Sequence, residues 1–154
     1  QGCLRGVPGS HKWGHLKHEE SDDPKSILAR GQYITDPFDE DKAVDFVLAP
    51  GEMVMFHNSL VHGSSINVGP DRRFLLLVEM VPTWAERPRG RESAMLLRGV
   101  DTFDAFDDEP RPDGEFTEQA VANWKRVVDS RAKRLFEDSP FAPSEAYGGV
   151  RAAT

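Results

Sequence analysis

The chain has 154 residues and a net charge of −7 at pH 7, from 26 acidic and 19 basic side chains. That length suits a single domain with a sizeable core. The negative net charge excludes the basic overall charge that is typical of a nucleic-acid-binding protein. The single cysteine, Cys3, excludes an internal disulfide and fits a reducing compartment. No apolar run approaches the roughly 18 residues of a membrane span, so we expect a cytoplasmic protein with neither nucleic acid nor membrane as partner.

Short β-strands separated by turns are predicted for the first half of the chain. Each is rich in apolar or β-branched residues and is bounded by turn residues, such as Pro8-Gly9 after the first and Ala49-Pro50-Gly51 before the fourth. Short strands at this close spacing predict an antiparallel β-sandwich or barrel. The predicted strands are residues 3–7, 32–35, 44–48, 53–56 and 74–81.

Residues 117–136 carry the clearest helix pattern. Thr117 is a suitable N-cap, and Lys133 and Arg134 lie in the last turn, where the helix dipole favours positive charge. We expect Trp124 to be the packing anchor that docks this helix on the sheet, with a partner-binding helix as the alternative. The apolar positions at helical spacing are Val121, Trp124, Val128 and Leu135.

Polar side chains crowd between the last two predicted strands, where sites on β scaffolds are commonly built. His62 can ligate iron, zinc or copper or act as a base, and it can equally be a hydrogen-bonded loop histidine. Arg73 begins an apolar strand, where a planar guanidinium suits a bound carboxylate; the alternative is an arginine turned to solvent, and Arg72 should face the opposite way. His57 lies five residues before His62, an odd separation that predicts opposite faces and a structural role.

Three sequence segments occur in a recognisable order. Gly2-Cys3-Leu4-Arg5 followed by Pro8-Gly9-Ser10-His11-Lys12 is similar to the pattern NGxLxxxPGSHK, Ala49-Pro50-Gly51-Glu52 precedes an apolar run, and His62-Gly63-Ser64-x-x-Asn67 is followed by Arg73. Together they resemble the phytanoyl-CoA dioxygenase family, whose members are non-haem iron enzymes dependent on 2-oxoglutarate. The resemblance covers residues 1–82 and, more loosely, residues 93–108.

The resemblance implies a fold and a chemistry. The implied fold is an all-β double-stranded β-helix, or jelly roll, that carries the C-terminal α-helix. The implied activity is that of an Fe(II)/2-oxoglutarate-dependent dioxygenase, which hydroxylates an unactivated carbon of a small-molecule substrate and uses O2 to decarboxylate 2-oxoglutarate to succinate. His62 is the implied metal ligand, Arg73 is implied to bind the far carboxylate of 2-oxoglutarate, and Ser64 is implied to hydrogen-bond the same carboxylate.

The sequence departs from the family pattern in its metal ligands. The family's His-x-Asp pair lies upstream of the PGSHK segment, and no His-x-Asp or His-x-Gly occurs in these residues, although His18-Glu19 comes near. We therefore expect residues 1–138 to be the C-terminal part of one jelly-roll oxygenase domain, and residues 139–154 to be a flexible tail.

Three alternatives stay open. A halogenase would use the same scaffold, with His-x-Gly or His-x-Ala upstream in place of His-x-Asp. A non-catalytic β-sandwich binding module is the second alternative, and an inert segment that needs an N-terminal half to fold is the third. The sequence leaves the identity of the substrate and the oligomeric state open.

Overall fold

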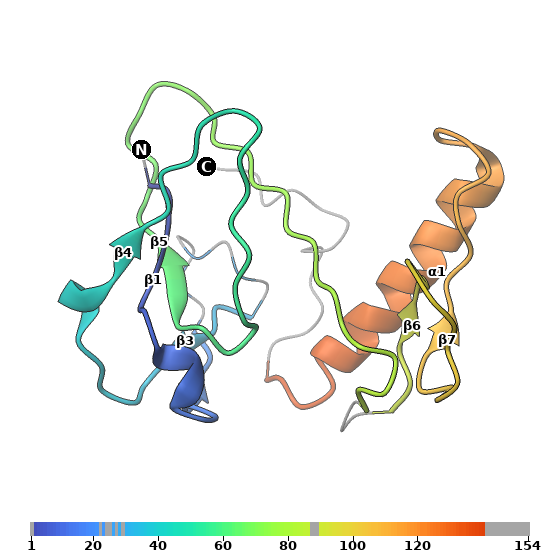
Figure 1. Cartoon of the computed structure of the whole chain (residues 1–154), viewed down its shortest axis with the longest axis horizontal. Helices are drawn as coiled ribbons and strands as arrows, with labels where there is room; N and C mark the ends of the chain where they lie inside the picture. The colour runs from blue at the N-terminus through green and yellow to red at the C-terminus, as the bar shows by residue number, and fades with distance from the viewer. Residues whose placement is uncertain are drawn as a thin grey trace. The chain divides into compact units, whose positions relative to one another are not determined.

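The computed structural model describes residues 2–21, 23, 26, 28, 30–86 and 90–140 (Figure 1). The chain divides into two compact units: Gln1–Asp23 with Gly31–Leu77, and Pro24–Arg30 with Val78–Thr154. The single domain expected for residues 1–138 stays a prediction. Residues 141–154 of the expected tail lie outside the described residues.

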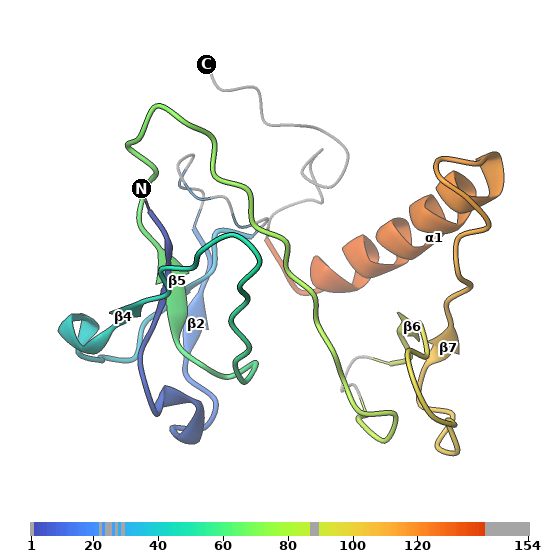
Figure 2. The ribbon, with the colours of Figure 1, turned by 45° about the horizontal axis from the view of Figure 1, so that its top comes forward.

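The first unit is built from short strands and two 3-10 helices: β1 (Leu4–Gly6), η1 (Ser10–Lys12), β2 (His18–Glu19), β3 (Tyr33–Ile34), η2 (Glu40–Lys42), β4 (Val44–Asp45) and β5 (His62–Ser64). Its main sheet is antiparallel with the order β4-β1-β5. The central strand β1 pairs Gly6 with His62 on one side and with Val44 on the other. β2 and β3 form a separate antiparallel pair (Figure 2).

Val7 and Val61 form the buried core of this unit, directly beside the β1–β5 pairing. Val7 N–H donates to Val61 O at 2.9 Å, and Val61 N–H donates to the Ser10 hydroxyl at 2.8 Å. Ser10 is only 1% exposed, so its hydroxyl replaces the water that the buried peptide has lost. Gly9 has φ 83°, the left-handed conformation that lets the chain turn back and bring Ser10 to β5.

Two of the predicted strands are not strands in the structure. Residues 53–56 and 74–81 lie outside the ladders, and among the described residues none of their backbone groups is hydrogen-bonded to another backbone group. Met53 and Met55 are exposed while Val54 and Phe56 are half-buried, so the first segment keeps the alternation of a strand. A ladder needs a neighbouring strand, which the described residues do not supply. Conversely, β5 formed where a loop was expected.

The second unit joins a short parallel β-pair to the C-terminal helix. β6 (Ser93–Ala94) pairs with β7 (Asp107–Asp108) in a parallel sense, which corrects the expectation of an entirely antiparallel fold. Parallel neighbours need a crossover of about a dozen residues, and the chain between the two strands provides one. Arg91 holds this ladder together, because its guanidinium donates to Asp107 at 3.0 Å and to Asp104 at 2.9 Å.

The helix α1 (Glu118–Leu135) confirms the predicted helix and its N-cap. The Thr117 hydroxyl accepts a hydrogen bond from Ala120 N–H at 3.1 Å, which satisfies one of the unpaired amide groups of the first turn. These signals are local in the sequence, and for that reason the residues alone sufficed to place the helix.

The expectation that Trp124 anchors this helix is wrong. Trp124 is 58% exposed, whereas Val127 is buried. The helix is attached to the β6 region by hydrogen bonds as well as by packing: Arg131 donates to Ser93 O at 3.3 Å, and Arg134 donates to Arg91 O. A polar docking face of this kind escapes a search for apolar periodicity.

The regular structure of the described residues consists of seven short β-strands, two 3-10 helices and one long C-terminal helix, which agrees with the predicted class at that level. Their sheets contain two or three strands, and no closed barrel is present in the described part. The same part of the chain contains no helix that is both long and apolar enough to cross a membrane.

Candidate functional site

β5 carries two of the predicted site residues on one face. His62 and Ser64 are two residues apart, and alternate residues of a strand point to the same side. Gly6 lies opposite His62 in the β1–β5 pairing, and a Cβ added to Gly6 would lie 2.8 Å from atoms of Leu60 and Phe46. The glycine therefore makes room for apolar side chains beneath the imidazole and the hydroxyl.

The His62 ring is oriented by one hydrogen bond and one ring contact. Its Nδ1 lies 2.7 Å from the carbonyl oxygen of Leu60; because a carbonyl can only accept, Nδ1 carries the proton in the neutral ring. Nε2 then keeps its lone pair for a metal ion or a proton. The Phe56 ring packs against the imidazole with 5.0 Å between centroids, and Phe46 lies 6.0 Å from Phe56.

His57 has the opposite arrangement. Its Nδ1 accepts a hydrogen bond from Ser59 N–H at 3.1 Å, which requires the proton of the neutral ring to be on Nε2. Its ring contacts that of His11, with 5.8 Å between centroids. His62 therefore offers a free Nε2 lone pair where His57 does not, which is consistent with the structural role predicted for His57.

We expect these two tautomers to be distinguishable in solution. At a pH where both rings are neutral, long-range proton–nitrogen NMR spectra should show His62 protonated at Nδ1 and His57 protonated at Nε2. Replacing Ser59 by proline removes the N–H donor and should shift the tautomer balance of His57 while leaving His62 unchanged. A His62 ring found mainly in the Nε2–H form would contradict the prediction that Nε2 is free to bind a metal ion.

The loop between β5 and residue 74 returns Arg73 to β5. Arg73 Nη1 donates to the Ser64 hydroxyl oxygen at 3.3 Å. The Asn67 side chain closes the turn by donating a hydrogen bond to Asp71 O at 2.7 Å. Asparagine side chains commonly bond to nearby backbone groups in turns. The two residues predicted to bind a carboxylate are thus in contact, beside the face that carries the imidazole.

Ser10 is a positioning residue that the sequence analysis did not identify. Its hydroxyl holds the Val61 peptide and so fixes the first residue before β5. Ser10 belongs to the PGSHK segment, which was recognised as a motif. Nothing in that segment indicates that the partner of the hydroxyl lies 51 residues away in the chain.

A hollow of about 220 Å³ adjoins the site, lined by residues of β1, β5 and the segment 38–43. Arg5 is among its polar lining residues, and its guanidinium is committed to Asp45 at 3.2 Å and to Ala43 O at 3.2 Å. Ligand pockets usually measure about 300–1,000 Å³. The hollow formed by the described residues is therefore smaller than a complete small-molecule site.

The described part of the chain does not gather further candidate metal ligands around His62. That part contains no group of three or more His, Cys, Asp or Glu side chains placed to hold a metal ion. One His-x-Glu is present, at His18 and Glu20, but it does not assemble with His62. His62 fits as one ligand, and a complete iron site would need further ligands from outside the described residues.

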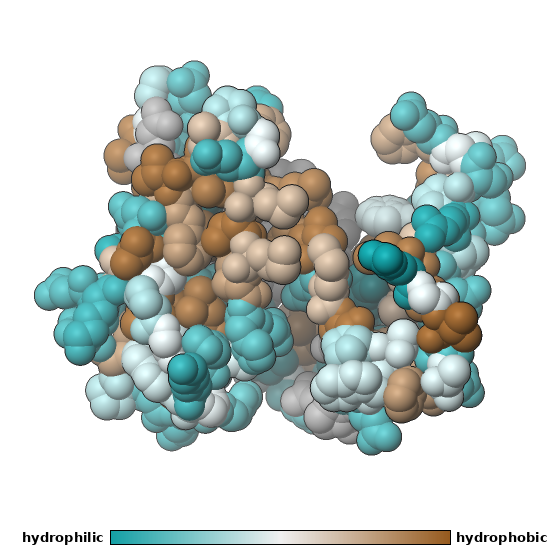
Figure 3. All heavy atoms as spheres, viewed as in Figure 1, coloured by the Kyte–Doolittle hydropathy of each residue, from teal (hydrophilic) through white to brown (hydrophobic). Residues whose placement is uncertain are grey.

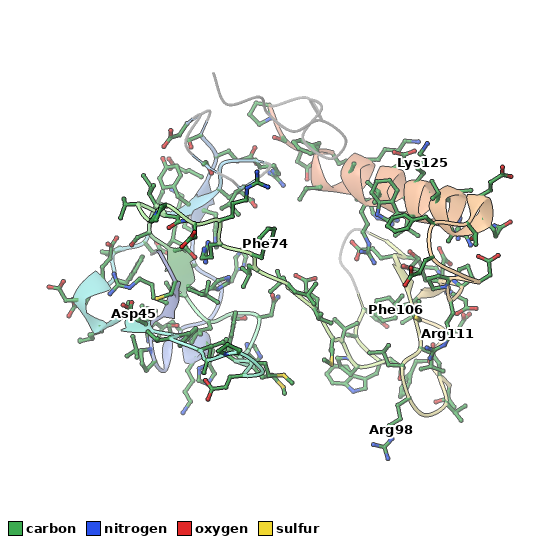
Figure 4. All side chains as sticks on the ribbon, turned by 90° about the horizontal axis from the view of Figure 1, so that it is seen from above. Asp45, Phe74, Arg98, Phe106, Arg111 and Lys125 are labelled. Atoms are coloured by element: carbon green, nitrogen blue, oxygen red, sulfur yellow. The ribbon has the colours of Figure 1, made fainter. Side chains whose placement is uncertain are left out.

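Two arginines of the second unit, Arg91 and Arg111, form hydrogen bonds within that unit. Hydrogen bonds to Asp104 and Asp107 raise the pKa of Arg91, and the same contact lowers the pKa of Asp104 below its ordinary value. Arg111 donates to a backbone carbonyl at 3.2 Å, whereas Arg98 points outward (Figure 4). These contacts assign Arg91 and Arg111 to holding the loops of this unit rather than to a ligand.

Known proteins resemble this chain over the region just described. Residues 1–75 match the sequence profile of the phytanoyl-CoA dioxygenase (PhyH) family. The dioxygenase cnsJ of Penicillium expansum is 26% identical over 142 residues, which cover 74% of this chain and 38% of cnsJ. An apo structure of the non-heme monooxygenase ThoJ has a TM-score of 0.65 and 28% identity, covering 88% of this chain and 48% of ThoJ. The chain therefore spans less than half the length of either relative.

Proposed function

We propose that this chain forms part of an Fe(II)/2-oxoglutarate-dependent dioxygenase of the phytanoyl-CoA dioxygenase family, acting on a small molecule, because residues 1–75 match the profile of that family. The observation that carries the proposal is the contact between Arg73 and Ser64 on the face of β5 that also presents His62. A metal-bound dicarboxylate needs to be held at both ends. The guanidinium and the hydroxyl can bind its free carboxylate, and the free imidazole nitrogen can bind the metal.

The proposed role of His62 is to donate Nε2 to the metal. The bond from Nδ1 to Leu60 O fixes the tautomer that leaves Nε2 free, and a partner at the second ring nitrogen typically raises the basicity of a metal-bound histidine. Phe56 packs against one side of the ring, which restricts its rotation. When bound, iron together with 2-oxoglutarate and O2 would supply the oxidising chemistry that hydroxylates an unactivated carbon and releases succinate.

The proposed role of Arg73 and Ser64 is to hold the far carboxylate of 2-oxoglutarate. The Ser64 oxygen accepts from Arg73, so the hydroxyl proton is directed away from the arginine and can be donated to a carboxylate. The guanidinium has further N–H groups that can pair with the same carboxylate in parallel. Binding the distant end in this way orients the keto-acid end toward the metal ligand.

The proposal includes a jelly roll and a cytoplasmic location. The small sheets described here would be parts of the two larger sheets of a jelly roll, completed by strands that the described residues do not contain. The cytoplasmic location is supported by the cysteine content, because Cys3 has no second cysteine to pair with.

The test uses the catalytically competent protein that contains this chain, supplied with Fe(II), 2-oxoglutarate and O2. Succinate formation should depend on all three. His62→Ala should lower the rate at least a hundredfold and weaken iron binding in a titration, because a ligand is lost. His57→Ala is the matched control and should retain iron binding. Equal loss in both variants, or turnover without His62, would reject the proposed role.

A further inference from the structure

Two of the chain's five histidines lie side by side on the surface of the first unit. The ring centroids of His15 and His18 are 5.8 Å apart, with 36° between the ring planes. Both residues are exposed, and neither belongs to the candidate site described above. Hydrophilic side chains cover the end of the first unit at which η1 lies, shortly before this pair in the chain (Figure 3). A small ion can therefore reach both rings from solvent.

The backbone that carries the second of these rings is held by the fold. His18 lies in β2, where it is paired with Ile34. The preceding residue, Lys17, donates its N–H to Asp36 Oδ2 at 2.7 Å, and its carbonyl oxygen accepts the N–H of Thr35 at 2.9 Å. Because this backbone is already ordered, placing the imidazole on an ion costs little further conformational entropy.

The ring nitrogens of the pair are available to a metal ion. His18 Nδ1 lies 2.7 Å from Leu16 O, so Nδ1 carries the proton of the neutral ring and Nε2 keeps its lone pair. The His15 ring forms no hydrogen bond with another described residue. Two imidazoles that share one ion have ring centroids roughly 5–6 Å apart, since each metal–nitrogen distance is about 2.0–2.1 Å. The separation of these two rings lies in that range.

A second histidine pair differs from this one in its free nitrogens. The rings of His11 and His57 also have their centroids 5.8 Å apart. However, His57 Nδ1 already accepts the N–H of Ser59, and its Nε2 carries the proton of the neutral ring. The two pairs have the same separation, but only the pair of His15 and His18 offers a lone pair on both rings.

We propose that His15 and His18 form a metal site of their own, which binds a divalent ion of borderline softness through two imidazoles. Imidazole suits both Zn(II) and Cu(II), and a given site usually binds Cu(II) more tightly. The described part of the chain assembles no group of three candidate ligands, so His62 does not join this pair. Water completes the coordination, and the ion stays more exchangeable than in a closed structural zinc site.

The test titrates Zn(II) into the metal-free chain without a histidine tag, at a pH where the histidine rings are neutral. The NMR signals of the His15 and His18 rings should move together and reach saturation at one ion per pair. His18→Gln keeps a polar side chain but loses the imidazole, and should weaken the binding reported by His15 at least tenfold. His57→Gln is the matched control, because it removes a ring from the other pair, and should bind within twofold of the original chain. Cu(II) should displace Zn(II) from the pair.

Two further measurements keep the result specific. In His62→Ala the paired signals should respond to Zn(II) as they do in the original chain, because the candidate iron site takes no part in this binding. Folding of each variant is checked by slow hydrogen exchange at the Val61 amide, which is bonded within the first unit. Shifts confined to one of the two rings, or equal weakening by His18→Gln and His57→Gln, would overturn the proposal. Loss of the paired response in His62→Ala would overturn it as well.

Discussion

Replacing Arg73 by alanine is expected to abolish useful 2-oxoglutarate turnover in the proposed oxygenase that contains this chain. Removing one partner of a hydrogen-bonded charge pair costs about 2–5 kcal/mol, or roughly 30- to 4,000-fold in binding. The loss should appear first as a raised KM for 2-oxoglutarate, because the proposed role of Arg73 is to hold the carboxylate that does not react. Succinate formation measured against 2-oxoglutarate concentration separates this effect from a change in kcat.

Two companion variants decide how that result is to be understood. Arg72→Ala removes the same charge one residue away, and Arg72 forms no hydrogen bond or ion pair with another described residue; its KM should stay within about twofold. Arg73→Lys keeps the charge but loses the planar fork, so its KM should fall between the two. If Arg73→Ala and Arg72→Ala raise KM equally, the arginine acts only through general charge and the carboxylate assignment fails.

The features predicted correctly from sequence are those whose cause is local. The helix follows from the spacing of its apolar residues and from the Thr117 cap, both of which lie within the segment itself. β1 likewise ends where Pro8-Gly9 imposes a turn. The family resemblance implies that Arg73 and Ser64 bind the same carboxylate, and the nine-residue separation of the two residues is short enough for one closed turn to bring them into contact.

The features missed from sequence depend on a distant partner. β5 became a strand because β1 supplies its ladder, although His62-Gly63-Ser64 has little strand propensity of its own. Residues 74–81 have strong propensity and no neighbour among the described residues. Trp124 lies at helical spacing with the other apolar residues, yet the docking side of α1 is set by Val127 and by arginines that bond to the β6 region. Strand propensity is a property of one segment, whereas backbone pairing in a sheet depends on two segments.

Valine in place of Gly6 is expected to destabilise the first unit by overpacking its described core. Gly6 is buried at the centre of the sheet, and an added Cβ would already lie 2.8 Å from side-chain atoms of Leu60 and Phe46. Two further methyl groups would force these side chains away from the position beneath His62. Overpacking of this kind costs about 1–3 kcal/mol, measured as a lower midpoint of urea unfolding at unchanged slope.

Gly63→Val provides the matched control, because it adds the same side chain to the neighbouring strand. A Cβ at Gly63 would meet nothing within 4 Å, and its partner across the ladder is Arg5 on the opposite face from His62. Since a glycine inside a strand is itself unfavourable by roughly 0.5–1 kcal/mol, Gly63→Val should be neutral or slightly stabilising. Only Gly6→Val should also change the NMR shifts of the His62 ring, since its effect passes through Leu60, whose carbonyl holds Nδ1. A stable Gly6→Val variant with an unchanged His62 signal would show that the imidazole does not depend on the packing beneath it, and the site would then have to be oriented by groups outside the described residues.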